Sequence, residues 1–259
     1  MPESASTFEL ASLGVWLVVG AVHAGVMAMT LLHPYLQRRT KRLRADQPPV
    51  SFLLPVRALD HDFDRCFDSV LKQDYPEFEV IVCSDSETAP GFEAARRLAG
   101  GAPKRPVSFL VAEAQVARNP KVNNLVPAFA AARHEFMLIR DSNILFEPGD
   151  LALLVRCFGE GVGLVSALPV ARDAQSFAAE VEQAMMNGRD APYVTAAGVL
   201  GIDVGYGKVM LFRKADFERG GGLARIANLF GDDHEISRMM ARQGLSTVYV
   251  DRVVTQNLG

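Results

Sequence analysis

The feature that most constrains the fold is a series of short apolar runs that alternate with longer amphipathic stretches. The runs cover residues 50–56, 78–84, 107–112 and 136–139, and polar residues bound each of them. Runs of this length are typical of buried strands. Between the first two, four apolar residues share one face of a helix: Phe63, Phe67, Val70 and Leu71. Strands that alternate with helices predict an α/β fold with a mixed, mostly parallel central sheet.

The second half of the chain continues this pattern less regularly. We expect helices over residues 150–158, 175–189 and 233–242, and strands over residues 162–168, 207–213 and 245–251. Residues 196–207 are rich in glycine, which predicts loops whose backbone can approach a ligand closely. The chain has 259 residues, of which 49% are apolar and 22% charged. This composition is typical of a folded protein.

One apolar run near the N-terminus is long enough to cross a bilayer. Residues 10–32 contain no Asp, Glu, Lys or Arg, and about 20 apolar residues in a helix span the hydrocarbon core. A cleaved signal peptide is the alternative, but the leader before the run carries no positive charge and the run is long for such a peptide.

The residues that follow this run predict its orientation. Five of them are basic: Arg38, Arg39, Lys41, Arg42 and Arg44. The positive-inside rule therefore predicts a single-pass membrane protein whose later residues are cytoplasmic. We expect an anchor over residues 1–36, a basic, proline-containing linker over 37–49 and a cytosolic domain over 50–259.

Net charge argues against nucleic-acid binding, and cysteine content argues against a zinc site and a disulfide framework. The net charge of −3 gives no electrostatic basis for binding nucleic acid. The three cysteines, Cys66, Cys83 and Cys157, are too far apart in the sequence for a zinc motif, and their odd number argues against a disulfide framework. All three lie in apolar runs, so we expect buried, reduced thiols.

Acidic residues follow two of the predicted strands and open one predicted helix. Asp85 follows the run 78–84, Asp141 follows the run 136–139, and Asp232 and Asp233 precede the last helix. Ligands of open α/β sheets bind beyond the carboxyl ends of the strands. Each acid alone could instead be a turn residue or a helix cap, and for Asp232 taken alone the capping role is the preferred interpretation. Together they predict a site for a phosphate-bearing substrate and a divalent metal.

Several motifs in a fixed order carry a resemblance to a known family. In chain order they read QDYPEFEVIVCSDS, NPKVNNL, IRDSNI, VGLVSALPVA, GDDHEISR and TQN. With these motifs the chain resembles the ceramide glucosyltransferases, a branch of the inverting glycosyltransferases with a GT-A fold. It is also similar to the bacterial hopanoid-associated glycosyltransferases of that branch. The resemblance extends from about Val50 to the last residue, and NPKVNNL with the later DSN and GDDHE is its most specific part.

The resemblance implies roles for the donor side of a site. Asp85 matches the aspartate that contacts the uracil and ribose end of a sugar nucleotide. Asp141 matches the aspartate that binds a divalent metal, Mg²⁺ or Mn²⁺. Many relatives carry D-x-D at this point, whereas this chain carries Asn143 in the last position, with an uncharged amide oxygen as the ligand. Lys121 and Asn123 lie in the NPKVNNL motif and are expected to bind substrate.

The resemblance also implies the acceptor side and the reaction. Asp233 matches the general base that accepts the proton of the acceptor hydroxyl, and Asp232 beside it is expected to bind substrate. The implied reaction moves a hexose, glucose in the first instance, from a UDP-sugar to a ceramide-like membrane lipid. The alternative is a hopanoid or polyprenyl lipid as the acceptor, with UDP-GlcNAc as a further candidate for the donor.

The family also carries a Q/R-x-x-R-W motif that these 259 residues do not contain. We therefore expect either that the sequence is a fragment of a longer enzyme or that the protein lacks this part. A non-catalytic protein that binds nucleotide sugars is the corresponding alternative. A metal-dependent phosphohydrolase built on Asp141 is a more distant one.

Overall fold

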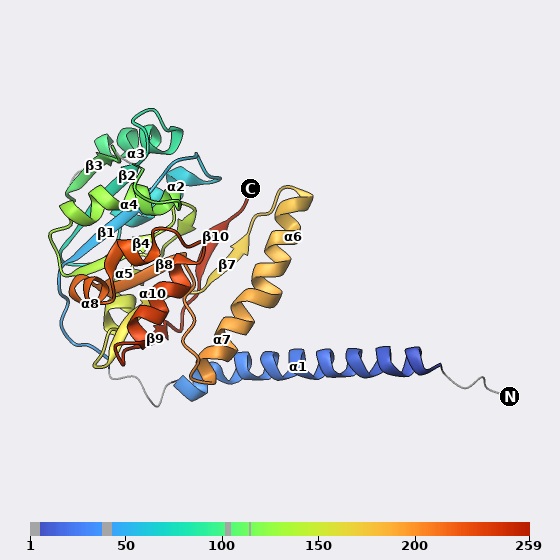
Figure 1. Ribbon diagram of the computed structural model, residues 1–259. Helices are drawn as coiled ribbons and strands as arrows, with labels where there is room; N and C mark the ends of the chain where they lie inside the picture. Colours follow the sequence, from blue (N-terminus) through green and yellow to red (C-terminus); the bar gives the residue numbers. More distant parts are fainter. Residues whose placement is uncertain (1–5, 38–42, 102–104, 114) are drawn as a thin grey trace.

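A seven-stranded sheet forms the centre of the protein. The structure, a computed structural model, describes residues 6–37, 43–101, 105–113 and 115–259. The strand order is β3-β2-β1-β4-β8-β6-β9 (Figure 1). The strands are β1 (Val50–Pro55), β2 (Phe78–Ser84), β3 (Val107–Val111), β4 (Phe136–Arg140), β6 (Val162–Ser166), β8 (Val209–Arg213) and β9 (Ser246–Tyr249). The first four in the order pair in parallel, and only β8 runs antiparallel to its neighbours β4 and β6.

Helices cover both faces of this sheet, which explains its continuous apolar strands. One core contains Phe52 and Leu54 of β1 with apolar residues of α2 (Phe63–Leu71), α3 (Pro90–Gly101) and α5 (Asp150–Arg156). The other contains Leu53 with apolar residues of α4 (Pro120–Ala131), α8 (Lys214–Arg219), α9 (Gly222–Ile226) and α10 (Asp232–Ala241). Successive side chains of a strand point to opposite faces. The predicted layered α/β architecture is confirmed.

A second sheet of three short strands lies beside the first. Its order is β5-β10-β7, with β5 (Ile144–Leu145), β7 (Pro169–Arg172) and β10 (Val254–Asn257). These strands are not among those predicted, because two to four residues are too few to show an alternating pattern. The sheet brings the TQN motif in β10 against the residues that follow β4, since Gln256 pairs with Ile144.

The glycine-rich residues 196–207 were expected to form loops, and the first part of that prediction is wrong. A helical rod runs through α6 (Phe177–Met185), the π-helical turn η1 (Met186–Asp190) and α7 (Ala191–Val199). Pro192 lies in the first turn of α7, and alanine and valine then continue the helix. The loop begins only at Leu200. The three cysteines are buried and their thiols are reduced, as predicted.

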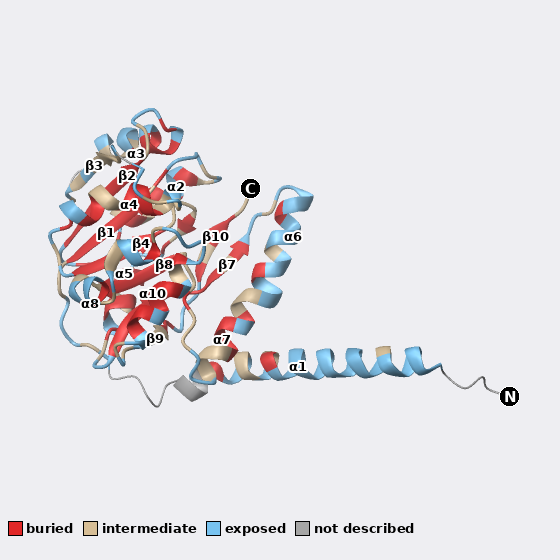
Figure 2. Cartoon of the chain, in the orientation of Figure 1, coloured by how far each residue is buried: buried red, intermediate tan, exposed pale blue. Residues whose placement is uncertain are grey.

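The predicted anchor forms one long helix, α1 (Thr7–Gln37). Within it, Thr7–His33 is long and apolar enough to cross a membrane, with a mean hydropathy of 2.0. Figure 2 shows α1 exposed along most of its length, with buried positions only near α7. Thr30 Oγ1 donates a hydrogen bond to the carbonyl of Pro192 at 3.1 Å. The predicted basic residues Arg38, Arg39, Lys41 and Arg42 lie outside the described residues, so their topology signal stays a prediction.

Candidate functional site

Asp141 lies at the carboxyl end of β4, between two lysines. Lys121 Nζ is 2.7 Å from its Oδ1 and Lys208 Nζ is 3.4 Å from its Oδ2. The backbone N–H of Asp141 donates to the carbonyl of Lys208 at 3.1 Å. The side chains of Asp141 and Lys121 are each 23% exposed, so the ion pair between them is only partly exposed to solvent.

The start of α4 positions Lys121. Asn119 caps the helix by accepting the backbone N–H of Lys121 at 3.0 Å, and Pro120 occupies its first position. Proline is favoured there because its missing N–H has no partner in a helix. Lys121 Nζ also donates to the carbonyl of Gly207 at 3.2 Å. The NPK sequence therefore fixes the ammonium group between Asp141 and the segment before β8.

The charges of this cluster shift one another's pKa values. Burial alone would raise the pKa of Asp141, but the ammonium groups of Lys121 and Lys208 outweigh it and hold the pKa below its usual value. Burial would likewise lower the pKa of Lys121, but the carboxylates of Asp141 and Asp232 hold it above its usual value. Both members of the pair are therefore ionised at neutral pH.

Two neighbouring cavities lie along the carboxyl ends of the parallel strands. The smaller, of about 290 Å³, is lined by Asp141, Asn143, Lys121, Lys208 and Arg57, among others. The larger, of about 640 Å³, is lined by Asp85, Asn123 and Arg118, among others. Arg57 and Pro120 line both cavities. The predicted residues Asp85, Lys121, Asn123, Asp141 and Asn143 therefore lie along one continuous region.

Asp85 and Asn123 differ in how they line the larger cavity. Asp85 follows β2 and lies 3.2 Å from the guanidinium Nε of Arg57. The amide of Asn123 is buried and makes two hydrogen bonds to the backbone of Ala117, accepting at 2.7 Å and donating at 2.9 Å. Asn123 therefore holds the chain segment before α4 in place.

Asp232 and Asp233 open α10, and their side chains differ in how they meet its first turn. The N-cap residue is Gly231, and Oδ1 of Asp233 accepts a hydrogen bond from the backbone N–H of His234 at 2.8 Å. Asp232 is 9% exposed, and among the described residues its Oδ2 has no hydrogen-bond partner. Burial raises the pKa of Asp232, while Lys121 acts in the opposite direction. The capping alternative for Asp232 therefore finds no support in the geometry.

Two glycines allow Asp233 to lie close to the segment before β8. A Cβ atom on Gly205 would lie 1.9 Å from the carbonyl oxygen of Asp233, and one on Gly207 would lie 3.0 Å from its Oδ2. Gly207 is also the residue whose carbonyl accepts from Lys121. The segment 205–208 thus lies between Asp233 and the lysine–Asp141 cluster, and touches both.

The residues near Asp141 can supply part of a metal site. Asp141 and Asn143 line the same cavity and offer a carboxylate and an amide oxygen. Within the described ranges, no group of three or more His, Cys, Asp or Glu side chains could hold a metal ion. Mg²⁺ at phosphate substrates is commonly held by one or two carboxylates, with phosphate oxygens and water as further ligands. The donor set fits that mode, with the two lysines as competitors for Asp141.

A comparison with family models decides which family this chain represents. The model described as "Glycosyl transferase family 21" matches residues 16–259. The chain belongs to this family.

Curated relatives of this family-21 chain carry the name ceramide glucosyltransferase. Ceramide glucosyltransferase 1 of Caenorhabditis elegans is 27% identical over 213 residues, which are 81% of this chain and 46% of the relative. A ceramide glucosyltransferase of Komagataella phaffii is 30% identical over 142 residues, 53% of this chain and 28% of the relative. The chain thus spans less than half the length of these relatives. The predicted resemblance is confirmed.

Solved structures similar to the family-21 chain confirm the predicted GT-A fold. A mannosyltransferase of Pyrobaculum calidifontis in complex with GDP-mannose and Mn²⁺ has a TM-score of 0.66 and 20% identity. The match covers 93% of this chain and 67% of that one. TarS of S. aureus has a TM-score of 0.53 and 16% identity, with 81% and 60% covered.

Sequence reasoning missed Lys208 and Arg57. Lys208 precedes β8, and the antiparallel pairing of β8 with β4 places Val209 opposite Arg140. Lys208 therefore faces Asp141, the residue after Arg140. This proximity depends on the antiparallel pairing of β8 with β4, and the sequence does not indicate which strands of a mixed sheet run antiparallel. Arg57 follows β1 by two residues, and its position next to the strand end was the available signal.

Proposed function

We propose that this chain is the nucleotide-sugar-binding and catalytic part of an inverting glycosyltransferase. In our proposal it moves a hexose from a UDP-sugar to the hydroxyl of a ceramide-like membrane lipid. The observation that carries the proposal is the segment 205–208, which lies between the Lys121–Asp141 cluster and Asp233. One short segment thus joins the groups needed on the donor side to a carboxylate suited to an acceptor. The names of the family-21 relatives supply the reaction class.

On the donor side, the leaving UDP gains negative charge as the bond to the sugar breaks. Lys121, Lys208 and Arg57 line the smaller cavity and can neutralise that charge. A divalent cation held by Asp141 and Asn143 would add Lewis-acid stabilisation of the diphosphate. The P. calidifontis mannosyltransferase, which was solved with Mn²⁺, supports this assignment. We assign Asp85, which lines the larger cavity, to contact with the nucleoside.

On the acceptor side, we assign Asp233 as the general base. Inversion requires the acceptor oxygen to attack from the face opposite the leaving group, with a proton acceptor within hydrogen-bond reach. Asp233 is half-buried at the start of α10 and lies against the segment before β8. We also assign Asp232 beside it to the acceptor side, where its Oδ2 is buried without a hydrogen-bond partner among the described residues.

We further propose that α1 anchors the enzyme in a membrane, with residues 1–36 as the anchor, 37–49 as linker and 50–259 as a cytoplasmic domain. The length and hydropathy of Thr7–His33 support the anchor, and the basic residues after it support the orientation. A lipid acceptor fits this arrangement because its hydroxyl lies at the bilayer surface.

The Asp233→Asn variant tests the assigned base. We expect transfer from UDP-glucose to ceramide in detergent to fall by about 10²- to 10⁴-fold, the usual contribution of a general base. UDP binding, followed by calorimetry, should be retained because Asp233 lies outside the donor cavities. Glu218→Gln, at an exposed acid of α8, is the matched control.

Two outcomes would redirect the proposal. Full activity of the Asp233→Asn variant would reject Asp233 as the base. UDP binding by the unaltered chain without turnover on ceramide, hopanoid or polyprenyl acceptors would instead support a nucleotide-sugar-binding protein. A panel of these lipids with UDP-glucose and UDP-GlcNAc, read by mass spectrometry, distinguishes the acceptors.

A further inference from the structure

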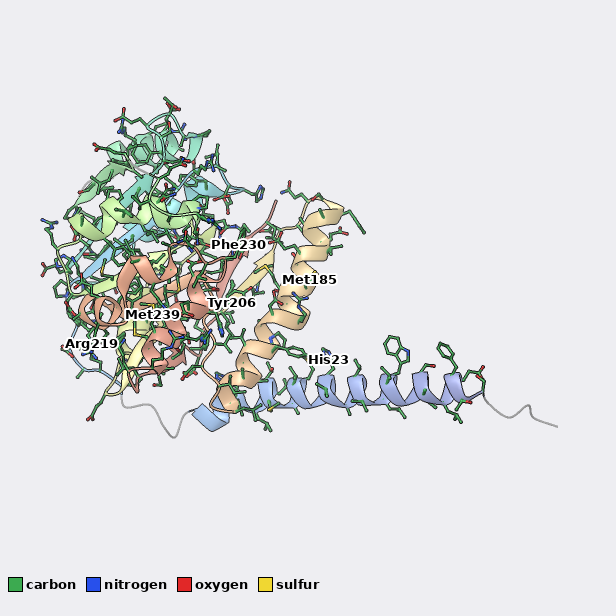
Figure 3. All side chains as sticks on the ribbon, viewed as in Figure 1. His23, Met185, Tyr206, Arg219, Phe230 and Met239 are labelled. Atoms are coloured by element: carbon green, nitrogen blue, oxygen red, sulfur yellow. The ribbon has the colours of Figure 1, made fainter. Side chains whose placement is uncertain are left out.

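The outward face of α6 exposes large apolar side chains. Phe177, Val181 and Met185 are 82%, 44% and 42% exposed. They recur every four residues and therefore share one face of the helix. The residues of α6 and η1 that are buried, Ala179 and Met186, lie seven residues apart on the opposite face. In Figure 3, Met185 lies on the side of α6 turned away from the sheets.

Exposed apolar side chains also continue along the rest of this rod. Tyr193 of α7 is 41% exposed, and Leu200 and Ile202 of the following loop are 63% and 55% exposed. Contiguous apolar surface on a protein of this size marks an interaction site with a protein, a membrane or a ligand.

The contact between α1 and α7 decides between the possible occupants. The rings of His23 and Tyr193 lie 6.4 Å apart, and Val26 of α1 is only 7% exposed. Residues Thr7–Val22 precede this contact, and at about 1.5 Å per residue they extend about 24 Å. The hydrocarbon core is about 30 Å thick and needs about 20 helical residues. Twenty residues counted from Thr7 end at Val26, inside the contact with α7.

It follows that α1 cannot span a bilayer unless α7 enters the edge of that bilayer. Figure 1 shows α6 and α1 diverging from α7 on the same side of the sheet domain. When α1 spans the bilayer, its contact with α7 therefore also brings the apolar face of α6 to the membrane surface. Helices with one apolar face lie in the bilayer interface with that face buried about 5–10 Å deep.

We propose that α6 and α7 form a membrane-docking surface, in which Phe177, Val181 and Met185 insert among the acyl chains of the leaflet next to the sheet domain. This inference rests on α1 spanning a bilayer, as proposed above, but not on the glycosyl-transfer reaction. The partner is a lipid surface, and a second copy of the chain is the competing occupant.

Site-specific labelling of the full chain in phosphatidylcholine vesicles tests the surface. The native cysteines are buried, so a bimane label will react selectively with Val181→Cys or Met185→Cys. Glu93→Cys, at an exposed position of α3, is the control. In vesicles with brominated acyl chains we expect severalfold quenching of bimane at positions 181 and 185 and none at position 93. Trp16, the only tryptophan, reports insertion of α1 in the unlabelled chain by the same quenching.

The outcomes separate the alternatives. Quenching of Trp16 without quenching at positions 181 and 185 would overturn the docking surface and leave the anchor intact. A blue-shifted bimane emission that bromine does not quench would assign the face to a second protein copy and would also overturn it. Absence of Trp16 quenching would reject the anchor and the docking surface together. Transferase activity enters none of these readouts.

Discussion

Asp141 has an ammonium group within 3.4 Å of each carboxylate oxygen. A divalent cation that binds Asp141 must therefore compete with at least one lysine. Lys208 is the more readily displaced, because its ion pair is the longer of the two and Lys121 is also held by the carbonyl of Gly207. Once displaced, Lys208 remains in the same cavity, where it can contact a phosphate oxygen.

Lys208→Met tests this exchange. Removing the competing ammonium should tighten binding of Mn²⁺ to the protein alone. The same change should weaken binding of UDP without metal by about tenfold or more, since a hydrogen bond to a charged group contributes about 1.5–3 kcal/mol. Calorimetry measures both affinities. Lys72→Met, at the exposed lysine that follows α2 as its C-cap residue, should change neither. Unchanged UDP affinity in the Lys208 variant would remove Lys208 from the phosphate site.

Asp232 illustrates a residue whose charge opposes folding. Its pKa is raised by burial, so the folded state binds its proton more tightly than the unfolded state does. The ionised carboxylate therefore destabilises the fold at neutral pH, and this effect disappears as the pH falls through the raised pKa. We expect Asp232→Asn to increase the free energy of unfolding at pH 7 by about 1–2 kcal/mol. Denaturant unfolding should show the difference shrinking towards pH 4, and a constant difference would contradict this account.

At the residue scale, the positions of the acids were predictable, whereas those of their basic partners were not. Asp85 and Asp141 follow strands and Asp233 opens a helix, as their motifs predict, and their roles stay predictions. Lys208 was missed because its motif is a single lysine before a strand, with no pattern of its own. Asn123 was assigned to substrate, whereas its amide is committed to the backbone of Ala117. Side-chain pairing of this kind depends on tertiary distances that spacing along the chain does not encode.

At the scale of elements, the segment before β8 controls where α10 begins. Gly205 allows the backbone of Asp233 to approach within a distance that no side chain permits. Gly205→Ala should therefore displace the start of α10 and lower the free energy of unfolding by about 1–3 kcal/mol or more, as overpacking does. It should also reduce transfer, because Asp233 moves with the helix.

A glycine in open space provides the control. Gly198 lies in α7 with nothing within 4 Å of an added Cβ, so Gly198→Ala should be neutral or stabilising by up to about 1 kcal/mol. Thermal unfolding and transfer rates are measured for both variants. Equal effects of the two substitutions would show that the contact of Gly205 with Asp233 does not constrain α10.

Long, fully buried strands were predictable from the sequence, and very short strands were not. Strands such as β2, in which every residue is buried, follow directly from continuous apolar runs. The strands β5, β7 and β10 are only two to four residues long, and their pairing depends on residues distant in the sequence. The last residues of α7, from Ala196 to Val199, were predicted to be loop because residues 196–207 are rich in glycine. The packing of α7 against α1, which stabilises the helix, is a tertiary effect.

At the scale of the whole molecule, the proposed membrane anchor has a consequence: the contact between α1 and α7 limits how much of α1 is free to enter a bilayer. That free length is set by the chain and does not adjust to the membrane. Bilayers differ in hydrophobic thickness, and each ångström of mismatch costs a fraction of a kcal/mol. A thicker bilayer would draw α7 inward or tilt α1, and a thinner one would lift the sheet domain away from the lipid surface.

The transfer rate should therefore depend on the hydrophobic thickness of the bilayer. We expect the rate of transfer to membrane-embedded ceramide to pass through a maximum across phosphatidylcholines of increasing acyl-chain length, at a fixed acceptor fraction. UDP binding should be the same throughout the series, because the donor cavities lie on the sheet. A flat rate profile would show that the height of the site above the bilayer does not limit transfer. If the maximum is found, the position of the contact between α1 and α7 determines the bilayer thickness, and so the kind of membrane, in which transfer is fastest.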